Sequence, residues 1–182
     1  MGIVHPGSEL TPTKAELLAA WLPRRSWWPG GADVAPFQAN FRFDDPEGEV
    51  GIETFLIPVG DDVVHVPVTY RSAPVDGGVL VGELEHSVLG HRWVYDGPSD
   101  PVYVAETSAV IREGRGEVTM LTEEGTEIPR RPFTASVRGS GSGHGALQIA
   151  RVVGSAAPAE ATGVLTATWA EHPTPAVLAW LA

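Results

Sequence analysis

Two carboxylates and an arginine lie close together in the segment from Gly90 to Tyr103, which is also rich in aromatic residues. Asp96 and Asp100, with Arg92 nearby, could suggest a catalytic site. The local pattern gives them structural roles instead, because Asp followed by Pro is typical of a helix N-cap and first helical position. We therefore expect no catalytic residue here. We expect a strand–turn–helix corner built by Arg92, Trp93, Tyr95, Asp96, Asp100 and Pro101.

A second group of carboxylates surrounds an Asp-Pro-Glu-Gly sequence and comprises Asp44, Asp45, Glu47 and Glu49. Paired carboxylates can hydrolyse glycosides when they are held about 5 to 9 Å apart across a cleft. The sequence around them is typical of a turn, in which Asp caps, Pro fixes φ and Gly supplies a positive φ. A structural turn is the favoured interpretation, and a carboxylate hydrolase is kept as a third functional hypothesis.

Four further residues, Glu83, Glu85, His86 and His91, have side chains that bind metal ions in other proteins. On a strand, Glu83 and Glu85 share one face whereas His86 points to the other. The spacing therefore predicts no metal site. The glycine-rich run at 139–145 matches neither common phosphate-binding pattern, so we expect a flexible hairpin loop there and no cofactor.

Polar side chains alternate with apolar ones along the predicted strands at 37–43 and 64–71. If these strands are neighbours, one face of the sheet presents Gln38, Asn40, Arg42, His65, Thr69 and Arg71. Such a face could bind a small polar ligand, a sugar or a sugar phosphate, through Arg42, His65 and Arg71. The alternative is an ordinary solvent-facing sheet surface.

A run of arginine and tryptophan follows the first predicted helix and contains Arg24, Arg25, Trp27 and Trp28. Trp and Arg anchor many protein interfaces, and because Trp27 and Trp28 are adjacent and lie beside two arginines, we expect neither of them to be fully buried. These four residues are candidates for contact with a ligand or a protein partner.

Two helices and ten strands are predicted to position these residues. The first helix begins with a capping box at Thr13 and Glu16 and stops at Pro23, and the second runs from Asp100 to Gly114. Strands are expected at 37–43, 49–57, 64–71, 79–86, 91–96, 118–121, 133–138, 147–153, 164–169 and 176–181, the last with a helical turn as alternative. Pro67 predicts an edge or bulged strand.

Short strands joined by Gly and Pro turns, without alternating helices, predict an α+β fold. We expect one domain over residues 1–182, with a curved, mostly antiparallel β-sheet flanked by two or three α-helices. The chain has 182 residues, 43% of them hydrophobic, which is enough for a substantial core.

The formal net charge of −11 argues against nucleic acid or an anionic membrane as a partner. The absence of cysteine excludes disulfides and thiolate chemistry. The sequence shows neither a signal peptide nor an apolar run long enough to span a bilayer, so a cytoplasmic location is expected.

Two segments resemble the N-terminal cap domain of actinobacterial maltokinases. One is the helix from Leu17 that ends in Leu-Pro-Arg-Arg-Ser-Trp-Trp at Trp28, and the other is Arg-Trp-Val-Tyr-Asp at 92–96 followed by Asp100-Pro101 and a helix. The resemblance implies a curved antiparallel sheet flanked by helices. This chain carries Pro-Gly-Gly at 29–31, where such caps carry Gly-Lys after the aromatic pair.

The residues of a kinase active site are not found in the sequence. Phosphoryl transfer of the kinase type needs a catalytic Asp, metal-binding Asn and Asp, and a Lys on the phosphates. Asn40 is the only asparagine and Lys14 the only lysine, and neither lies in such a context. We expect a stand-alone, non-catalytic cap-like module that contacts a kinase or a glucan-metabolising enzyme in maltose, trehalose or glycogen metabolism. The alternative is the small-ligand binder described above.

Overall fold

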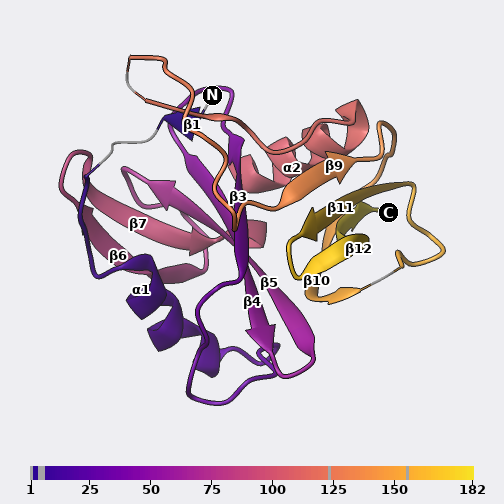
Figure 1. Ribbon diagram of the computed structural model, residues 1–182, viewed down its shortest axis with the longest axis horizontal. Coiled ribbons are helices and arrows are strands. Elements are labelled where there is room, and N and C mark those ends of the chain that lie inside the picture. The colour runs from indigo at the N-terminus through magenta and orange to yellow at the C-terminus, as the bar shows by residue number, and fades with distance from the viewer. Residues whose placement is uncertain (1, 4–6, 123, 155) are drawn as a thin grey trace.

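The computed structural model describes residues 2–3, 7–122, 124–154 and 156–182 (Figure 1). The helices are α1 (Lys14–Trp21), α2 (Pro101–Glu113) and the short 3₁₀ turns η1 (Leu22–Arg24) and η2 (Gly97–Ser99). The strands are β1 (Gly2–Ile3), β2 (Leu10–Thr11), β3 (Ala39–Asp44), β4 (Gly51–Val59), β5 (Asp62–Arg71), β6 (Leu80–His86), β7 (Gly90–Asp96), β8 (Met120–Leu121), β9 (Ser136–Gly139), β10 (Leu147–Gly154), β11 (Gly163–Trp169) and β12 (His172–Leu181).

The N-terminal half forms an antiparallel sheet in the order β2-β6-β7-β5-β4-β3, and α1 packs against it from below in Figure 1. The predicted capping box is confirmed: the Glu16 amide donates to Thr13 Oγ1, and the Thr13 amide donates to the Glu16 carboxylate. α1 buries Leu17, Leu18 and Trp21 against the sheet. This packing fixes where the start of the helix, with Lys14, lies over the strands.

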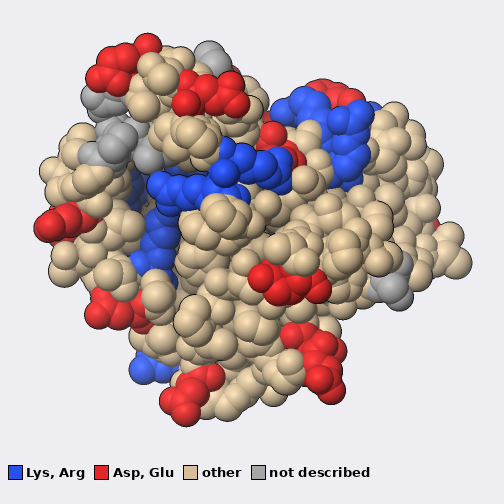
Figure 2. Space-filling view, viewed as in Figure 1, with Lys and Arg blue, Asp and Glu red and all other residues tan. Residues whose placement is uncertain are grey.

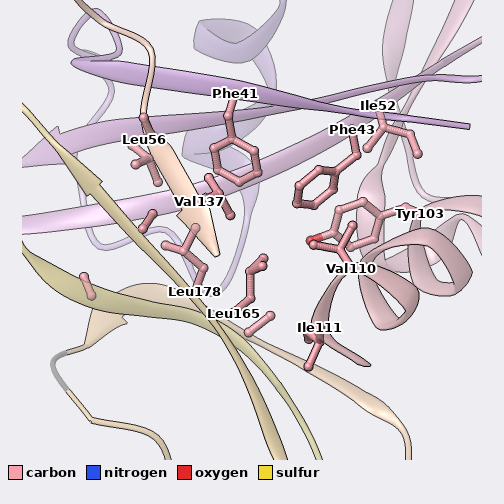
Figure 3. Close-up of a cluster of buried hydrophobic side chains, with 14 of the residues drawn as sticks. Phe41, Phe43, Ile52, Leu56, Tyr103, Val110, Ile111, Val137, Leu165 and Leu178 are labelled. Carbon is pink, nitrogen blue, oxygen red and sulfur yellow. The ribbon is translucent and has the colours of Figure 1, made fainter. Parts of the chain in front are cut away.

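The C-terminal half continues from β5 through β10, β12 and β11 to β9. The segment before β9 then returns to β3, because Thr134 and Asn40 form a parallel bridge. A ring of hydrogen-bonded segments thus encloses a second core, and α2 packs against it (Figure 3). Side chains from the sheet and from α2 point toward one another there, among them Phe41, Phe43, Leu165, Tyr103, Val110 and Ile111.

β5 is the strand that joins the two halves. It pairs with β4 along its whole length, whereas on its other side Val68 pairs with the end of β7 and Val64 pairs with Val152 of β10. Pro67 lies between these two partners, at the point where its missing N–H is not needed. The prediction of an edge or bulged strand at Pro67 is therefore wrong, because a central strand that changes neighbours also tolerates proline.

The prediction of a mostly antiparallel α+β fold is confirmed, although its α-helices are few and short. A strand occurs at every predicted position, and Ala176 to Leu181 belongs to the strand β12, which resolves the alternative left open there. Within the described residues, no helix is long and apolar enough to cross a membrane.

The glycine-rich run at 139–145 is packed rather than flexible, which corrects the expectation from sequence. The amides of Gly139 and Gly141 donate to carbonyls at the end of α2, and the Ser140 amide donates to Val164 of β11. Gly145 adopts a φ of +99° close to the backbone of Ala182. The loop therefore joins the end of α2 to three strands of the second core.

Replacing Gly139 with alanine should destabilise the protein by about 3 kcal/mol, because the core resists overpacking. An added Cβ would overlap the carbonyl oxygen of Val110 and lie 2.8 Å from the Cα of Ile111, and both are backbone atoms that cannot turn away. Urea unfolding measures the loss. Gly31→Ala is the matched control, since its Cβ would meet no atom within 4 Å. A loss of less than about 1 kcal/mol at Gly139 would contradict this packing.

Candidate functional site

The predicted strand–turn–helix corner is held by an ion pair between Arg71 and Asp100. Arg71 donates from Nε and Nη2 to the two carboxylate oxygens of Asp100, at 2.7 and 2.6 Å. Thr69 Oγ1 and the Val102 amide also donate to this carboxylate, so Asp100 caps α2 as predicted. Burial raises the pKa of Asp100, but these donors outweigh it and hold the pKa below its ordinary value. Both carboxylate oxygens of Asp100 and two donor nitrogens of Arg71 are thus engaged in structural contacts.

The other residues of this corner also make contacts that stabilise the fold. Pro101 is the first residue of α2, and the Tyr95 hydroxyl accepts from the Val75 amide. The His91 ring packs edge-on against Trp93, with ring centres 4.4 Å apart, and Arg92 donates to the His91 carbonyl. The corner is thus a packed junction between β7 and α2.

Asp96 forms the second buried ion pair, with Arg151 of β10. The pair lies where the neighbour of β5 changes from β7 to β10, close to Pro67. Burial raises the pKa of Asp96, and Arg151 and Arg25 oppose that shift. The guanidinium of Arg151 also lies 3.9 Å from the ring centre of Trp27. Through Arg151, Asp96 is therefore linked to the tryptophan run.

The tryptophan run itself is only partly exposed. Trp28 is buried and donates from its indole nitrogen to the Gly31 carbonyl. Trp27 is half-buried, in edge contact with Trp21 at 5.6 Å between ring centres, and Arg25 lies over Trp21 at 5.0 Å. Arg24 is exposed. The expectation that both adjacent tryptophans avoid full burial is wrong for Trp28.

The predicted polar face does not exist as one surface, because β4 separates β3 from β5. Arg42 of β3 lies directly opposite Glu53 of β4 in the strand register, on the face that α1 covers. His65 pairs with Leu56 and belongs to the opposite face, where it is fully buried. Arg71 bonds to Asp100, also on that opposite face. The sheet therefore separates Arg42 from His65 and Arg71, because they lie on opposite faces.

Two other predicted clusters have plain structural explanations. Asp45 accepts from the amides of Glu47, Glu49 and Val50, as expected of a turn. His91 lies between Glu85 and Glu83, with nitrogen–oxygen distances of 2.6 and 3.0 Å, and its hydrogen bond to the Glu85 carboxylate contributes most to raising its pKa. In the part of the chain that the structure describes, no group of three or more His, Asp or Glu residues is placed to hold a metal ion.

A hollow of about 290 Å³ opens between the face of β3 and β4, the start of α1 and the segment at 117–134. The segment is tied down because the Val118 amide donates to the Arg42 carbonyl and the Asn40 amide to the Phe133 carbonyl. We call this the basic hollow, and its charged lining comprises Lys14, Arg42, Arg130, Arg131, Glu53, Glu117 and Glu127. Figure 2 shows basic side chains gathered across the upper part of this face, with acidic ones scattered around it.

Glu53 lies at the floor of the basic hollow and is only 3% exposed. It accepts from Lys14 Nζ at 2.6 Å, from Asn40 Nδ2 at 3.0 Å and from the Tyr70 hydroxyl at 2.9 Å. Burial alone would raise the pKa of Glu53, but Lys14 and Arg42 hold it below its ordinary value. Glu53 is therefore an ionised group with three hydrogen-bond donors, and it fixes the positions of Lys14 and Asn40.

Sequence reasoning missed most of this hollow. Glu53 is a charged residue within an otherwise apolar strand, and that interruption was the available signal. Arg130 and Arg131 lie in a loop whose return to β3 depends on a contact across more than ninety positions, Asn40 with Thr134. No local pattern predicts such a contact.

A comparison with protein families finds a match in the N-terminal half of the chain. Residues 21–100 match the family model of the maltokinase N-terminal cap domain. This part of the chain is therefore similar to that cap domain. The family resemblance of the tryptophan run and the strand–turn–helix corner is thereby confirmed. No curated protein and no solved structure matches the chain.

The cap-like region supplies only part of each site. It contains Arg42 and Glu53 of the basic hollow and Asp96 of the buried ion pair. Lys14, Arg130 and Arg131 lie outside the matched residues, as does Arg151. Both the hollow and the Asp96–Arg151 pair are therefore assembled between the cap-like region and the rest of this chain.

Proposed function

We propose that this protein is a non-catalytic accessory module of the cap type, which acts by contact with a kinase or a glucan-metabolising enzyme of maltose, trehalose or glycogen metabolism in the cytoplasm. The match of residues 21–100 to the maltokinase cap model carries the proposal. The engagement of Asp96 and Asp100 in buried ion pairs supports it, since these two carboxylates could have suggested a catalytic site.

The tryptophan run offers the surface for such a contact. Trp27 is held between Arg151 and Trp21, and Arg24 is exposed beside it. A Trp whose rotamer is already fixed loses little entropy on binding, and Trp and Arg are the residues most often found at energetic centres of interfaces. This surface lies within the cap-like region, so the proposed interface and the family assignment concern the same residues.

Affinity capture from a native lysate tests the proposal, with tagged wild-type protein and an Arg24→Glu variant as baits. We expect the wild-type protein to retain a sugar kinase or a glucan-metabolising enzyme, identified by mass spectrometry. The charge reversal should reduce that retention, with Arg138→Glu as a matched exposed control. Capture of no such enzyme at low or moderate salt would contradict the proposed function.

The alternative, a small-ligand binder, cannot use the predicted set Arg42, His65 and Arg71, because the sheet separates Arg42 from the other two. The hydrolase hypothesis gains no support, because Asp44, Asp45, Glu47 and Glu49 do not line the basic hollow. Ligand binding retains one candidate location, on the Arg42 side of the sheet.

A further inference from the structure

The charges of the basic hollow are not balanced by one another. Lys14 pairs with Glu53, and Arg130 Nη1 pairs with Glu117 at 2.6 Å. Within the described ranges, Arg42 and Arg131 have no ion pair, and Arg131 lies 5.8 Å from the ring centre of Phe133. The lining thus carries four cations and three carboxylates, so it is positive within a chain whose net charge is −11.

Arg42 is the residue through which this excess of positive charge points to a bound anion. Its side chain is half-buried and close enough to Glu53 to help hold the pKa of that carboxyl down. Glu53 already accepts from Lys14, Asn40 and Tyr70, and among the described residues the Arg42 guanidinium donates no hydrogen bond to it. A partly desolvated guanidinium without a bonded anion is unfavourable, and an anion in the hollow would remove that cost.

The rest of the lining indicates what kind of anion fits. Asn40, Thr119 and Thr134 provide hydrogen-bonding groups, and Phe133 is 37% exposed beside Arg131. An exposed ring beside polar groups suits the apolar face of a hydroxyl-bearing ligand. The volume of about 290 Å³ is at the small end of ligand pockets, which favours a small metabolite over a nucleotide.

We propose that the basic hollow binds a small organic phosphate of hexose phosphate size, with its phosphate on Arg42 and Arg131 and its hydroxyls toward Asn40 and Thr134. Planar guanidinium groups bind phosphate oxygens in pairs, which a lone ammonium group such as Lys14 cannot do. The role of Glu53 is to hold Lys14 and Asn40 in place beneath the ligand. The site is separate from the tryptophan run and does not depend on the proposed protein contact.

Isothermal titration calorimetry with glucose 6-phosphate, inorganic phosphate and glucose tests this site. We expect glucose 6-phosphate to bind with a Kd of about 1 mM or below, inorganic phosphate to bind more weakly, and glucose not to bind at about 10 mM. Binding should weaken several-fold when the salt concentration is raised, because part of the hollow is open to solvent.

Two variants locate the binding. Arg42→Gln and Arg131→Gln should each weaken glucose 6-phosphate binding about tenfold or more, which corresponds to about 1.4 kcal/mol. Arg131 is exposed, so its replacement tests the site without disturbing the fold, and Arg138→Gln is the control that should leave affinity unchanged. The absence of binding by either phosphate at about 10 mM, or equal affinity in the wild type and both variants, would overturn the proposal.

Discussion

Asp100→Ala should lower the free energy of unfolding by about 3–5 kcal/mol, the largest effect expected for a single polar substitution in this chain. Asp100 is fully buried and accepts from Arg71, Thr69 and the Val102 amide. The substitution leaves the Arg71 guanidinium without its anion and removes the N-cap of α2, which alone is worth about 1 kcal/mol. Urea denaturation followed by tryptophan fluorescence gives the loss.

Three further variants separate the contributions. Asp100→Asn keeps a capping oxygen and should recover about 1 kcal/mol of the loss. Adding Arg71→Met to Asp100→Ala removes the uncompensated charge, so the double variant should be more stable than the sum of the single changes predicts. Glu160→Ala, at an exposed position, should change stability by less than about 0.5 kcal/mol. An Asp100→Ala loss of the same small size would show that this ion pair does not hold the corner.

Stability should also fall as the pH is lowered, because His65 is buried in its neutral form. Burial and the nearby Arg151 lower the pKa of His65 to about 3, against an ordinary value of 6.5. The unfolded chain binds a proton at His65 between these two values and the folded chain does not. The free energy of unfolding should therefore decrease by about 1.4 kcal/mol per pH unit below pH 6.5 and level off near pH 3.

His65→Gln isolates this effect from other groups that titrate in acid. The raised pKa of Asp96 acts with the opposite sign, since a carboxyl that gains its proton more readily in the folded state stabilises that state as the pH falls. Between pH 7 and pH 4.5 the wild type should therefore lose about 2–3 kcal/mol more than the variant. Exposed His144→Gln should behave as the wild type. Equal pH dependence in wild type and His65→Gln would exclude a buried neutral imidazole.

Local patterns in the sequence predict the elements of this fold well. The capping box at Thr13 and Glu16, the Asp100-Pro101 helix start and the Asp45 turn are each decided by contacts within a few residues. Such contacts leave a pattern that can be read without knowing the tertiary structure. The strand positions follow for the same reason.

The faces of the sheet could not be predicted in the same way. Alternation along residues 64–71 indicates a half-buried strand, but β5 is covered on both sides, by α1 and by the second core. His65 and Thr69 are consequently buried polar residues rather than a solvent-facing surface. Pro67 was misleading for a related reason, since only the tertiary arrangement shows that β5 changes neighbours there.

The basic hollow depends on contacts that are distant in sequence, and the same holds for the packed glycine run. Arg130 and Arg131 reach the Arg42 side of the sheet only because residues 133–135 pair with Asn40. Glycines at 139–145 suggest flexibility until the backbone atoms of α2 are placed against them. In both cases the missing information is which segments meet.

The strand–turn–helix corner is structural, and we propose that the protein binds a ligand at the basic hollow. Amide chemical-shift mapping by NMR, with glucose 6-phosphate added to the uniformly labelled protein, tests both parts at once. We predict that the shifted amides cluster at residues 40–42, 53 and 117–134, and that Arg71 and Asp100 do not move. Shifts centred on Arg71 and Asp100, or no shifts at saturating concentration, would contradict the account.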